Sequence, residues 1–343
     1  MLNRYFFGLW ATLLLTALSV RAQDPQFSQF YASPLYLNPA FAGSTQEARA
    51  GLNYRNQWPA MEANFVSYSA YFDYMFQDYN SGLGFMVMSD QASRSGLRSN
   101  TLSAQYAYQI RISKTLAFRP GAQFSYTFRD ANFDQFYFNS QWNPTTGSFD
   151  GAPPVNDVSG LGARFMGLGL GGLLYSKLFW IGYAAHHLNT PNQSFTGDSD
   201  PLSIKHSIHG GYKVLLEPKR TKGGYREATR ERSFTPTFQY KMQGDFDQLD
   251  VGSYLTLEPL VLGIWYRGLP FKPYEGLRNN EAIILLIGYT YQGLNMGYSY
   301  DYTISNLGIA SGGAHEISLS YQFPLRDPRK PPRDKMSVPC PKF

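Results

Sequence analysis

Few residues in this sequence have types and spacing that could support catalysis. His186 and His187 resemble a metal-binding pair, but adjacent residues of a strand point to opposite faces and cannot both ligate from regular geometry. His315 and Glu316 meet the same obstacle as an acid–base pair. The glycine-rich run 167–172 lacks the Lys-Ser/Thr that completes a phosphate-binding loop. The sequence therefore predicts no enzyme, no cofactor and no bound metal.

Charged side chains inside regular strands are the second kind of residue that could carry a function. Polar and apolar residues alternate along these strands, and the alternation places a set of charges on the polar face. The set comprises Asp73, Arg111, Arg119, Lys241, Asp250, Asp301 and Glu316. Its mixed signs favour internal ion pairs or contacts to an inserted segment over a selectivity ring of one sign. Solvation in a watery interior is the alternative, and both interpretations predict that these side chains point inward.

The composition indicates the environment of such strands. Charged residues make up only 16% of the 343 residues, against about 25% in an ordinary soluble domain. Aromatic residues also make up 16%, with 26 Tyr and 25 Phe beside 32 Gly. The mean hydropathy of −0.33 excludes a bundle of transmembrane helices, and the many large apolar residues exclude disorder. This composition is typical of a membrane β-barrel.

Period-two alternation runs through most of the chain and predicts strands. Between residues 100 and 112, for example, Leu102, Tyr106 and Ile110 alternate with polar neighbours. Most runs match or exceed the roughly 9–11 residues with which a tilted strand crosses a bilayer. Only a closed barrel satisfies every backbone group in lipid, so we expect an all-β, transmembrane antiparallel barrel of about 14 strands. The expected strands are 47–58, 64–76, 82–90, 98–111, 114–128, 163–175, 178–188, 203–216, 232–243, 247–257, 260–267, 281–291, 294–303 and 314–323.

An even number of strands places both ends of the barrel on its periplasmic side. The connections expected on that side are mostly short, whereas 129–157, 189–202, 268–280 and 304–313 on the opposite side are mostly longer. Short periplasmic turns and long outer loops are typical of outer-membrane barrels. The segment 217–231 is the exception, because it is a long and basic connection on the periplasmic side. The expected location is the outer membrane of a Gram-negative envelope, with its lipid bilayer around the barrel.

The two ends of the chain differ from the barrel. Residues 1–22 have the basic start, apolar stretch and small-residue end of a secretory signal peptide. Residues 23–46 precede the barrel (47–323), and 324–343 form a basic, proline-rich tail. The leader and the tail carry the positive charge, so the basic balance gives no argument for nucleic-acid binding. We expect an extended tail that docks a periplasmic partner. Its expected docking residues are Arg329, Lys330, Arg333, Lys335, Cys340 and Phe343.

Two shorter features concern assembly and the interior of the barrel. The last strand ends in Tyr321 and Phe323, an aromatic pair that resembles the C-terminal signal read by the outer-membrane assembly machinery. Before the first strand, Pro39 excludes a continuous helix and biases Asn38 to extended geometry. This segment is either a capped turn leading into the first strand or an aromatic-rich plug in the lumen. A barrel of this size otherwise encloses solvent.

Several stretches resemble the PorP/SprF family of outer-membrane proteins from the type IX secretion and gliding machinery. The N-terminal signature contributes Phe27, Phe30, Asn38, Pro39 and Gly43; a loop motif contributes His187, Leu188, Asn189 and Pro191; the last hairpin contributes Gly313, His315 and Glu316; and the chain ends with the motif Cys340 to Phe343. The segment 129–157 is longer than we expect for the family.

The resemblance implies a non-catalytic barrel that links an exported or surface adhesin to periplasmic components of the machinery. Whether the role lies in the secretion core or in adhesin display stays open. The alternative function is a FadL-like transport channel gated by the N-terminal segment.

Overall fold

The computed structural model describes residues 24–45, 47–92, 96–131, 142–149, 162–195, 197–216, 230–274, 277–323 and 338–341. The expected signal peptide and most of the basic tail lie outside the described residues. Among the described residues, no helix is long and apolar enough to span a membrane.

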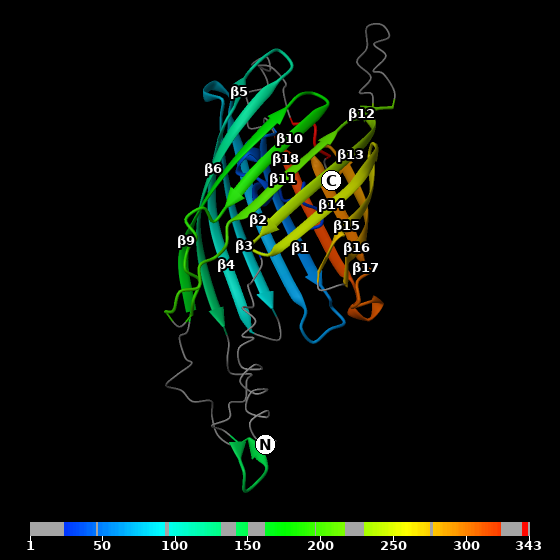
Figure 1. The fold of residues 1–343 in the computed structure, drawn as a ribbon. Helices are drawn as coiled ribbons and strands as arrows, with labels where there is room; N and C mark the ends of the chain where they lie inside the picture. Colours follow the sequence, from blue (N-terminus) through cyan, green and yellow to red (C-terminus); the bar gives the residue numbers. More distant parts are fainter. Residues whose placement is uncertain are drawn as a thin grey trace.

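The chain forms a closed antiparallel barrel of fourteen strands, which confirms the predicted fold (Figure 1). The first strand pairs with the last from Ala48–Phe323 to Gln57–Ala314, and this pairing closes the ring. The strands of the ring are β1 (Ala48–Gln57), β2 (Phe65–Phe76), β3 (Ser81–Ala92), β4 (Leu97–Tyr108), β6 (Ala117–Ala131), β9 (Gly162–Tyr175), β10 (Phe179–His186), β11 (Lys205–Tyr212), β13 (Arg232–Gln243), β14 (Phe246–Leu257), β15 (Leu260–Tyr274), β16 (Leu277–Tyr291), β17 (Leu294–Thr303) and β18 (Ala314–Phe323).

Four shorter strands complete the sheets. β5 (Ile110–Arg111) pairs with β6, and β12 (Val214–Leu215) pairs with β13. β7 (Trp142–Asn143) and β8 (Ser148–Phe149) form a small hairpin of their own. We call the end that carries β5 and β12 the turn end, and the opposite end, which carries β7 and β8, the loop end; the turn end is uppermost in Figure 1.

The outer face of the barrel is apolar. Leu102, Ile181 and Ile264 are about half exposed, and they belong to an exposed set of large apolar side chains contributed by every strand of the ring. In lipid this surface is solvated by acyl chains, so the alternation predicted from the sequence is the alternation of a lipid face with an interior face. The apolar outer surface is therefore covered by lipid and needs no protein partner to bury it.

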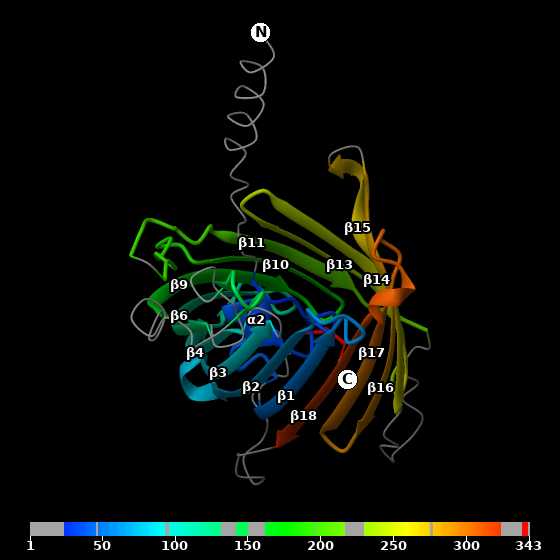
Figure 2. The same ribbon diagram turned by 90° about the horizontal axis from the view of Figure 1, so that it is seen from below.

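The interior is not simply polar, as the sequence reasoning had assumed. Trp180, Tyr254, Trp265 and Ile284 point inward and are almost fully buried, although large apolar residues were expected mainly on the lipid face. They pack against residues of the N-terminal segment. This segment lies within the ring of strands, where its helix α2 (Pro34–Leu37) is seen in the axial view of Figure 2. The inward apolar side chains are therefore the core of a plugged barrel.

Candidate functional site: the plugged interior

Residues 24–45, which we call the plug, fold by local rules that Asn38 and Pro39 impose. α2 ends at Leu37, and a 3₁₀ turn η1 (Pro39–Phe41) follows at once, with Pro39 at its first position. The Asn38 side chain accepts a hydrogen bond from Ala40 N–H at 2.9 Å and so caps this turn. Its amide also donates to Gly172 O and Tyr183 O on the barrel wall, at 3.2 and 3.0 Å. One side chain thus shapes the plug and attaches it.

Glycines in the wall let the plug backbone approach the strands. A Cβ on Gly82 would lie 1.9 Å from Ala42 O, and a Cβ on Gly121 would lie 2.4 Å from Ala40 N. Any side chain at either position would collide with plug backbone, which cannot rotate away as a side chain can. The signal for these contacts was present in the sequence as glycines on the inward face of strands.

Near the turn end, two arginines fix the last residues of the plug. Arg49 forms a two-pronged ion pair with Asp73, at 2.8 and 3.0 Å, and Asp73 also accepts the Gly43 N–H at 2.8 Å. Arg119 is fully buried and donates to the carbonyl oxygens of Ala40 and Ala42. The inward positions predicted for Asp73 and Arg119 thus correspond to contacts with the plug.

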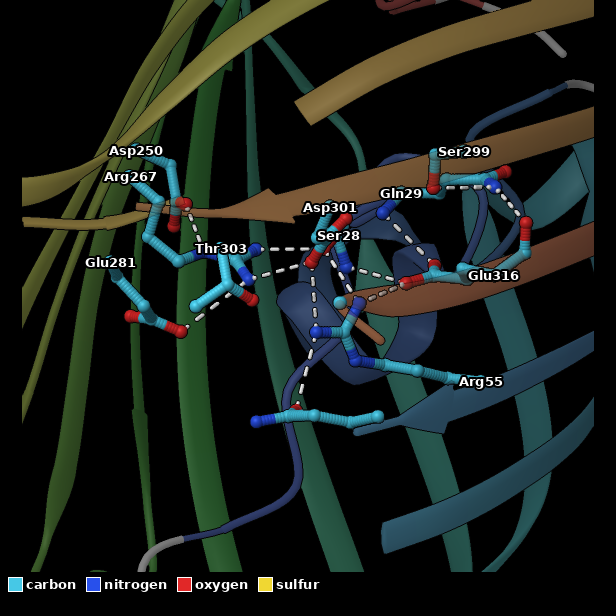
Figure 3. A network of polar contacts seen from close by, with 12 residues as sticks. Ser28, Gln29, Arg55, Asp250, Arg267, Glu281, Ser299, Asp301, Thr303 and Glu316 are labelled. Atoms are coloured by element: carbon cyan, nitrogen blue, oxygen red, sulfur yellow. Dashed lines mark hydrogen bonds and ion pairs between the residues drawn. The ribbon is translucent and has the colours of Figure 1, made fainter. Parts of the chain in front are cut away.

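A buried network of charges holds the middle of the plug (Figure 3). The Ser28 hydroxyl donates to Asp301 at 2.6 Å and accepts hydrogen bonds from Arg55 at 2.7 Å and Arg267 at 2.9 Å. The backbone N–H groups of Ser28 and Gln29 donate to Glu316 at 2.6 and 2.9 Å. Ser28 of the plug therefore forms hydrogen bonds with both acidic and basic side chains of the barrel wall.

The same network continues across the wall of the barrel. Arg55 pairs with Asp301 and Glu316, and Arg267 pairs with Asp301, Asp250 and Glu281 (Figure 3). All of these groups except Glu281 are nearly inaccessible to water. Buried charges are costly unless paired, so removal of one partner leaves the others uncompensated. The network is a strong constraint on where the plug can lie.

At the loop end, Asp24 fixes the start of the described plug. Its carboxylate lies 2.6 Å from Lys205 Nζ and 2.9 Å from His187 Nε2. Burial alone would raise the pKa of Asp24, but Lys205 and His187 outweigh burial and hold it well below its usual range. The predicted motif residue His187 therefore contacts the plug.

Replacement of Asp24 by asparagine should loosen this end of the plug. Because the folded-state pKa is depressed, the carboxylate contributes its stabilisation fully above the ordinary pKa of about 4 and loses it as the pH falls through the lower folded value. Asp24→Asn should lower the free energy of unfolding by about 1–3 kcal/mol at pH 7. Urea unfolding across pH should show this difference vanish in acid, whereas the exposed Asp130→Asn variant should unfold like the unmodified protein throughout.

Aromatic contacts fill the space between plug and wall. Phe30 packs edge-on against Trp265 at 4.9 Å between ring centroids, and Tyr31 packs likewise against Trp180 at 5.5 Å. The indole N–H of Trp180 donates to the Tyr31 hydroxyl at 3.0 Å. The predicted motif residue Phe27 is also buried, against Tyr36 of the plug itself. The signature aromatics thus form an apolar core inside the barrel.

The structure corrects the expectation for the end of the tail. Val338 belongs to the interior apolar cluster, and Cys340 packs against it. Val338, Cys340 and Pro341 line a small space together with Tyr31, Arg49 and Tyr71. Cys340 is therefore packed against the interior of the barrel, whereas the sequence predicted that it extends away from it. The other expected docking residues, Arg329, Lys330, Arg333, Lys335 and Phe343, lie outside the described residues.

The remaining predicted residues divide by position. Lys241 and Asp250 line the interior, with the Lys241 ammonium 3.9 Å from the Asp250 carboxylate. Arg111 is exposed at the turn end in β5, so it is not a lumen charge as predicted; β5 lies at the edge of the barrel, beyond the part that encloses the plug.

The loop and hairpin motifs have structural roles. Asn189 accepts from Leu168 N–H and donates to Met166 O, at 2.9 and 2.8 Å, so its side chain continues the pairing with β9 beyond the end of β10, and Leu188 beside it is exposed. Pro191 accepts the Leu202 N–H at 2.9 Å.

In the last hairpin, Gly313 has a positive φ of 66° and accepts the Trp58 N–H at 2.7 Å. His315 lies within 2.9 Å of the Tyr298 hydroxyl, on the face opposite Glu316. Tyr321 and Phe323 stack with ring centroids 5.7 Å apart.

Sequence reasoning missed Arg49, Arg55, Lys205 and Arg267, which make the strongest contacts of the interior. The alternation of β1 would have placed Arg49 and Arg55 on one face with Gly51 and Asn53, so this signal was available. In the described part of the chain, no three His, Cys, Asp or Glu side chains gather so as to hold a metal ion.

A closed barrel with an apolar outer band defines the class of this protein. It is a membrane protein that forms a β-barrel like the outer-membrane porins. Its sequence matches the family model "Type IX secretion system membrane protein PorP/SprF" over residues 19–321. The chain belongs to the PorP/SprF family, and this membership implies association with the type IX secretion machinery.

Solved structures show more distant likenesses. The outer-membrane protein Omp33 of Acinetobacter baumannii is 9% identical with a TM-score of 0.41, covering 82% of this chain and 100% of that one. A deltaS2 mutant of the monoaromatic hydrocarbon channel TodX is 13% identical with a TM-score of 0.45, covering 85% and 94%. A Pseudomonas aeruginosa FadL homologue is 12% identical with a TM-score of 0.42, covering 85% and 94%. No curated protein matches the sequence significantly.

Proposed function

We propose that this protein is a non-catalytic outer-membrane component of type IX secretion or gliding that links an exported or surface protein to the secretion machinery. The observation that carries the proposal is the filled interior. Residues 24–45 and 338–341 occupy the barrel from the two ends of the sequence and pack against one another. A barrel filled by its own chain suits an adaptor that presents two faces better than it suits an open pore.

The two faces of the barrel differ in what they offer a partner. With the usual orientation of outer-membrane barrels, the loop end faces outward and the turn end faces the periplasm. The exported protein would meet the loop end, where the β7–β8 hairpin carries the exposed Trp142. The machinery would meet the turn end, where β12 and β18 end, because the basic connection 217–231 and the basic tail follow these strands in the sequence. Basic segments favour acidic partners through long-range attraction.

Two variants test the two faces separately. In one, residues 142–149 are replaced by glycine and serine; in the other, Arg329, Lys330, Arg333 and Lys335 are replaced by glutamine while 338–341 is kept. After gentle solubilisation and mass spectrometry, the first variant should lose a surface protein and keep periplasmic components. The second should show the reverse. Unchanged co-purification in both variants, with normal export, would remove the adaptor proposal.

The alternative is a transport channel gated by the plug. It is favoured by unpartnered hydroxyls on the inward face of β13, where Thr235 Oγ1 and Thr237 Oγ1 have no hydrogen-bond partner among the described residues. Such groups could line a path along which the plug moves. Steady, substrate-dependent conductance of the unmodified protein in planar bilayers would favour the channel, whereas silence together with a bound protein partner would favour the adaptor.

A further inference from the structure

Residues 338–341, which we call the tail segment, lie at the turn end between the plug and the wall. Three of them line a space of about 20 Å³, which is also lined by Tyr31 of the plug and by Arg49, Tyr71 and Gln322 of the wall. A space of this size holds about one water molecule. The tail segment therefore fills nearly all of the gap between plug and wall at this point, and we call the surfaces around it the seat.

The tail segment is held by apolar burial. Val338, Pro339 and Pro341 are buried and Cys340 is half-buried, and Val338 belongs to the same apolar cluster as Tyr31. A proline has no N–H, so two of the four residues are buried without a backbone donor that needs a partner. The fixed φ of proline also lowers the conformational entropy that is lost on docking. The tail segment is thus suited to dock as a short, stiff, apolar element.

The wall of the seat is more polar than the tail segment. Asn295 and Ser320 line it and are joined by a hydrogen bond of 3.2 Å. Asn295 is only 2% exposed, yet its Oδ1 has no hydrogen-bond partner among the described residues. Arg49 is paired with Asp73. Water can satisfy such groups when the tail segment leaves, so the seat tolerates both a filled and a hydrated state.

Tyr31 is the plug residue on which the tail segment acts. Its ring packs edge-on against Trp180, and its hydroxyl accepts the indole N–H at 3.0 Å. Trp180 belongs to β10, which lies across the ring from β1 and β2, the strands that carry Arg49 and Tyr71 of the seat. Tyr31 therefore lies between the tail segment and the opposite wall, and the seated segment holds it there.

We propose that the tail segment is a latch, which holds the plug around Tyr31 while it is seated and frees this part when an acidic periplasmic partner draws the preceding chain away. The sequence before Val338 is basic, and Lys335 is only three positions from it. A partner that surrounds these cations competes with the seat for the adjoining chain, so it binds the released state better and shifts the equilibrium toward it. Only this coupling rests on the proposed function, in that the machinery meets the basic tail.

The first test unseats the tail segment by Val338→Asp, because an unpaired carboxylate cannot be buried in an apolar cluster without a large penalty. Cys340 is the only cysteine of the chain, so its reaction with a bulky maleimide reports the released state. The reaction should be about tenfold faster in the variant. Amide hydrogen exchange over residues 30–33, where Ala32 N–H donates to Gln29 O at 2.8 Å, should accelerate as much, while exchange in β3 and β14 stays unchanged. Val338→Ile should behave like the unmodified protein in both measurements.

A second variant guards against general damage to the fold. In a chain that ends at residue 337, exchange over residues 30–33 should be fast, and a synthetic peptide of sequence Val-Pro-Cys-Pro-Lys-Phe should slow it again. The same peptide with aspartate in place of valine should not. Faster labelling of Cys340 with unchanged exchange over 30–33, or no rescue by the peptide, would overturn the latch.

The coupling is tested with deca-glutamate as the acidic probe. At low salt it should speed the labelling of Cys340 by about threefold or more, but not when Arg329, Lys330, Arg333 and Lys335 are replaced by glutamine. Equal labelling with and without the probe would overturn the coupling. These measurements use the isolated protein, so they are distinguishable from the test of the proposed function. A co-purified partner without a latch leaves the adaptor standing, and a latch without a co-purified partner leaves the latch standing.

Discussion

Replacing Gly82 and Gly121 by alanine is expected to release the plug while leaving the barrel closed. Each new Cβ would lie within 2.4 Å of plug backbone, at Ala42 O and Ala40 N, and neither atom can move without shifting η1. Overpacking of this kind costs about 1–3 kcal/mol at each site. The strands themselves keep their pairing and their lipid face. The substitutions are therefore expected to weaken the binding of the plug to the wall and to leave the barrel intact.

Two measurements should report the release. Amide hydrogen exchange over residues 35–42 should accelerate about tenfold or more, and planar bilayers should show a conductance that the unmodified protein lacks. The matched control is Gly169→Ala, a buried glycine whose Cβ would meet only atoms of the barrel wall, the nearest being Ala185 O at 3.3 Å. If the double variant exchanges and conducts like this control, the close approach of the plug to β3 and β6 is not what holds it.

The second large effect is expected at Asp301. Its carboxylate accepts hydrogen bonds from Ser28 Oγ at 2.6 Å, Arg55 at 2.9 Å and Arg267 at 3.1 Å. Asp301→Asn would leave two buried guanidinium groups with one fewer anion. Loss of one member of a buried ion network costs about 3–5 kcal/mol, so the variant should unfold at a markedly lower urea concentration.

Two further variants test the cause of this loss. Asp247→Asn removes a carboxylate from the pair with Lys272 at the loop end, where the lysine is 65% exposed, and should cost no more than about 1 kcal/mol. Asp301→Asn combined with Arg267→Met removes one charge of each sign and should recover part of the stability. A double variant as unstable as the sum of the two single variants would show that uncompensated charge is not the reason.

The barrel was predictable because its signal is repeated in every strand. The alternation of Leu102, Tyr106 and Ile110 with polar neighbours recurs around the ring, and a tilted strand must satisfy both lipid and interior at once. The predicted strands agree with the observed ones mostly to within a few residues. The main departures lie in β15 and β16, which continue beyond the bilayer-sized runs that the pattern revealed.

The interior was less predictable, because it depends on contacts between distant residues. The strand register places Trp265 on the inner face of the barrel, although an apolar side chain is expected on the lipid face. The contact of Trp265 with Phe30 of the plug explains why an apolar side chain lies inside. In the same way, Cys340 lay in a tail that is basic and rich in proline, and composition alone indicated exposure. Burial of the short segment 338–341 requires a partly filled barrel with room left near Tyr31 and Arg49.

The contacts of Ser28 and Gln29 also fix the order in which the molecule can be completed. Ser28 N–H bonds to Glu316, and the Gln29 side chain bonds to Ser318, across 288 and 289 positions of the sequence. Glu316 and Ser318 lie in β18, the strand that pairs with β1, so these bonds need β18 in its place in the ring. Contacts between residues so far apart form late in folding, because the whole intervening chain must be ordered first. The contacts of Ser28 and Gln29 therefore join the plug to the closing strand of the barrel.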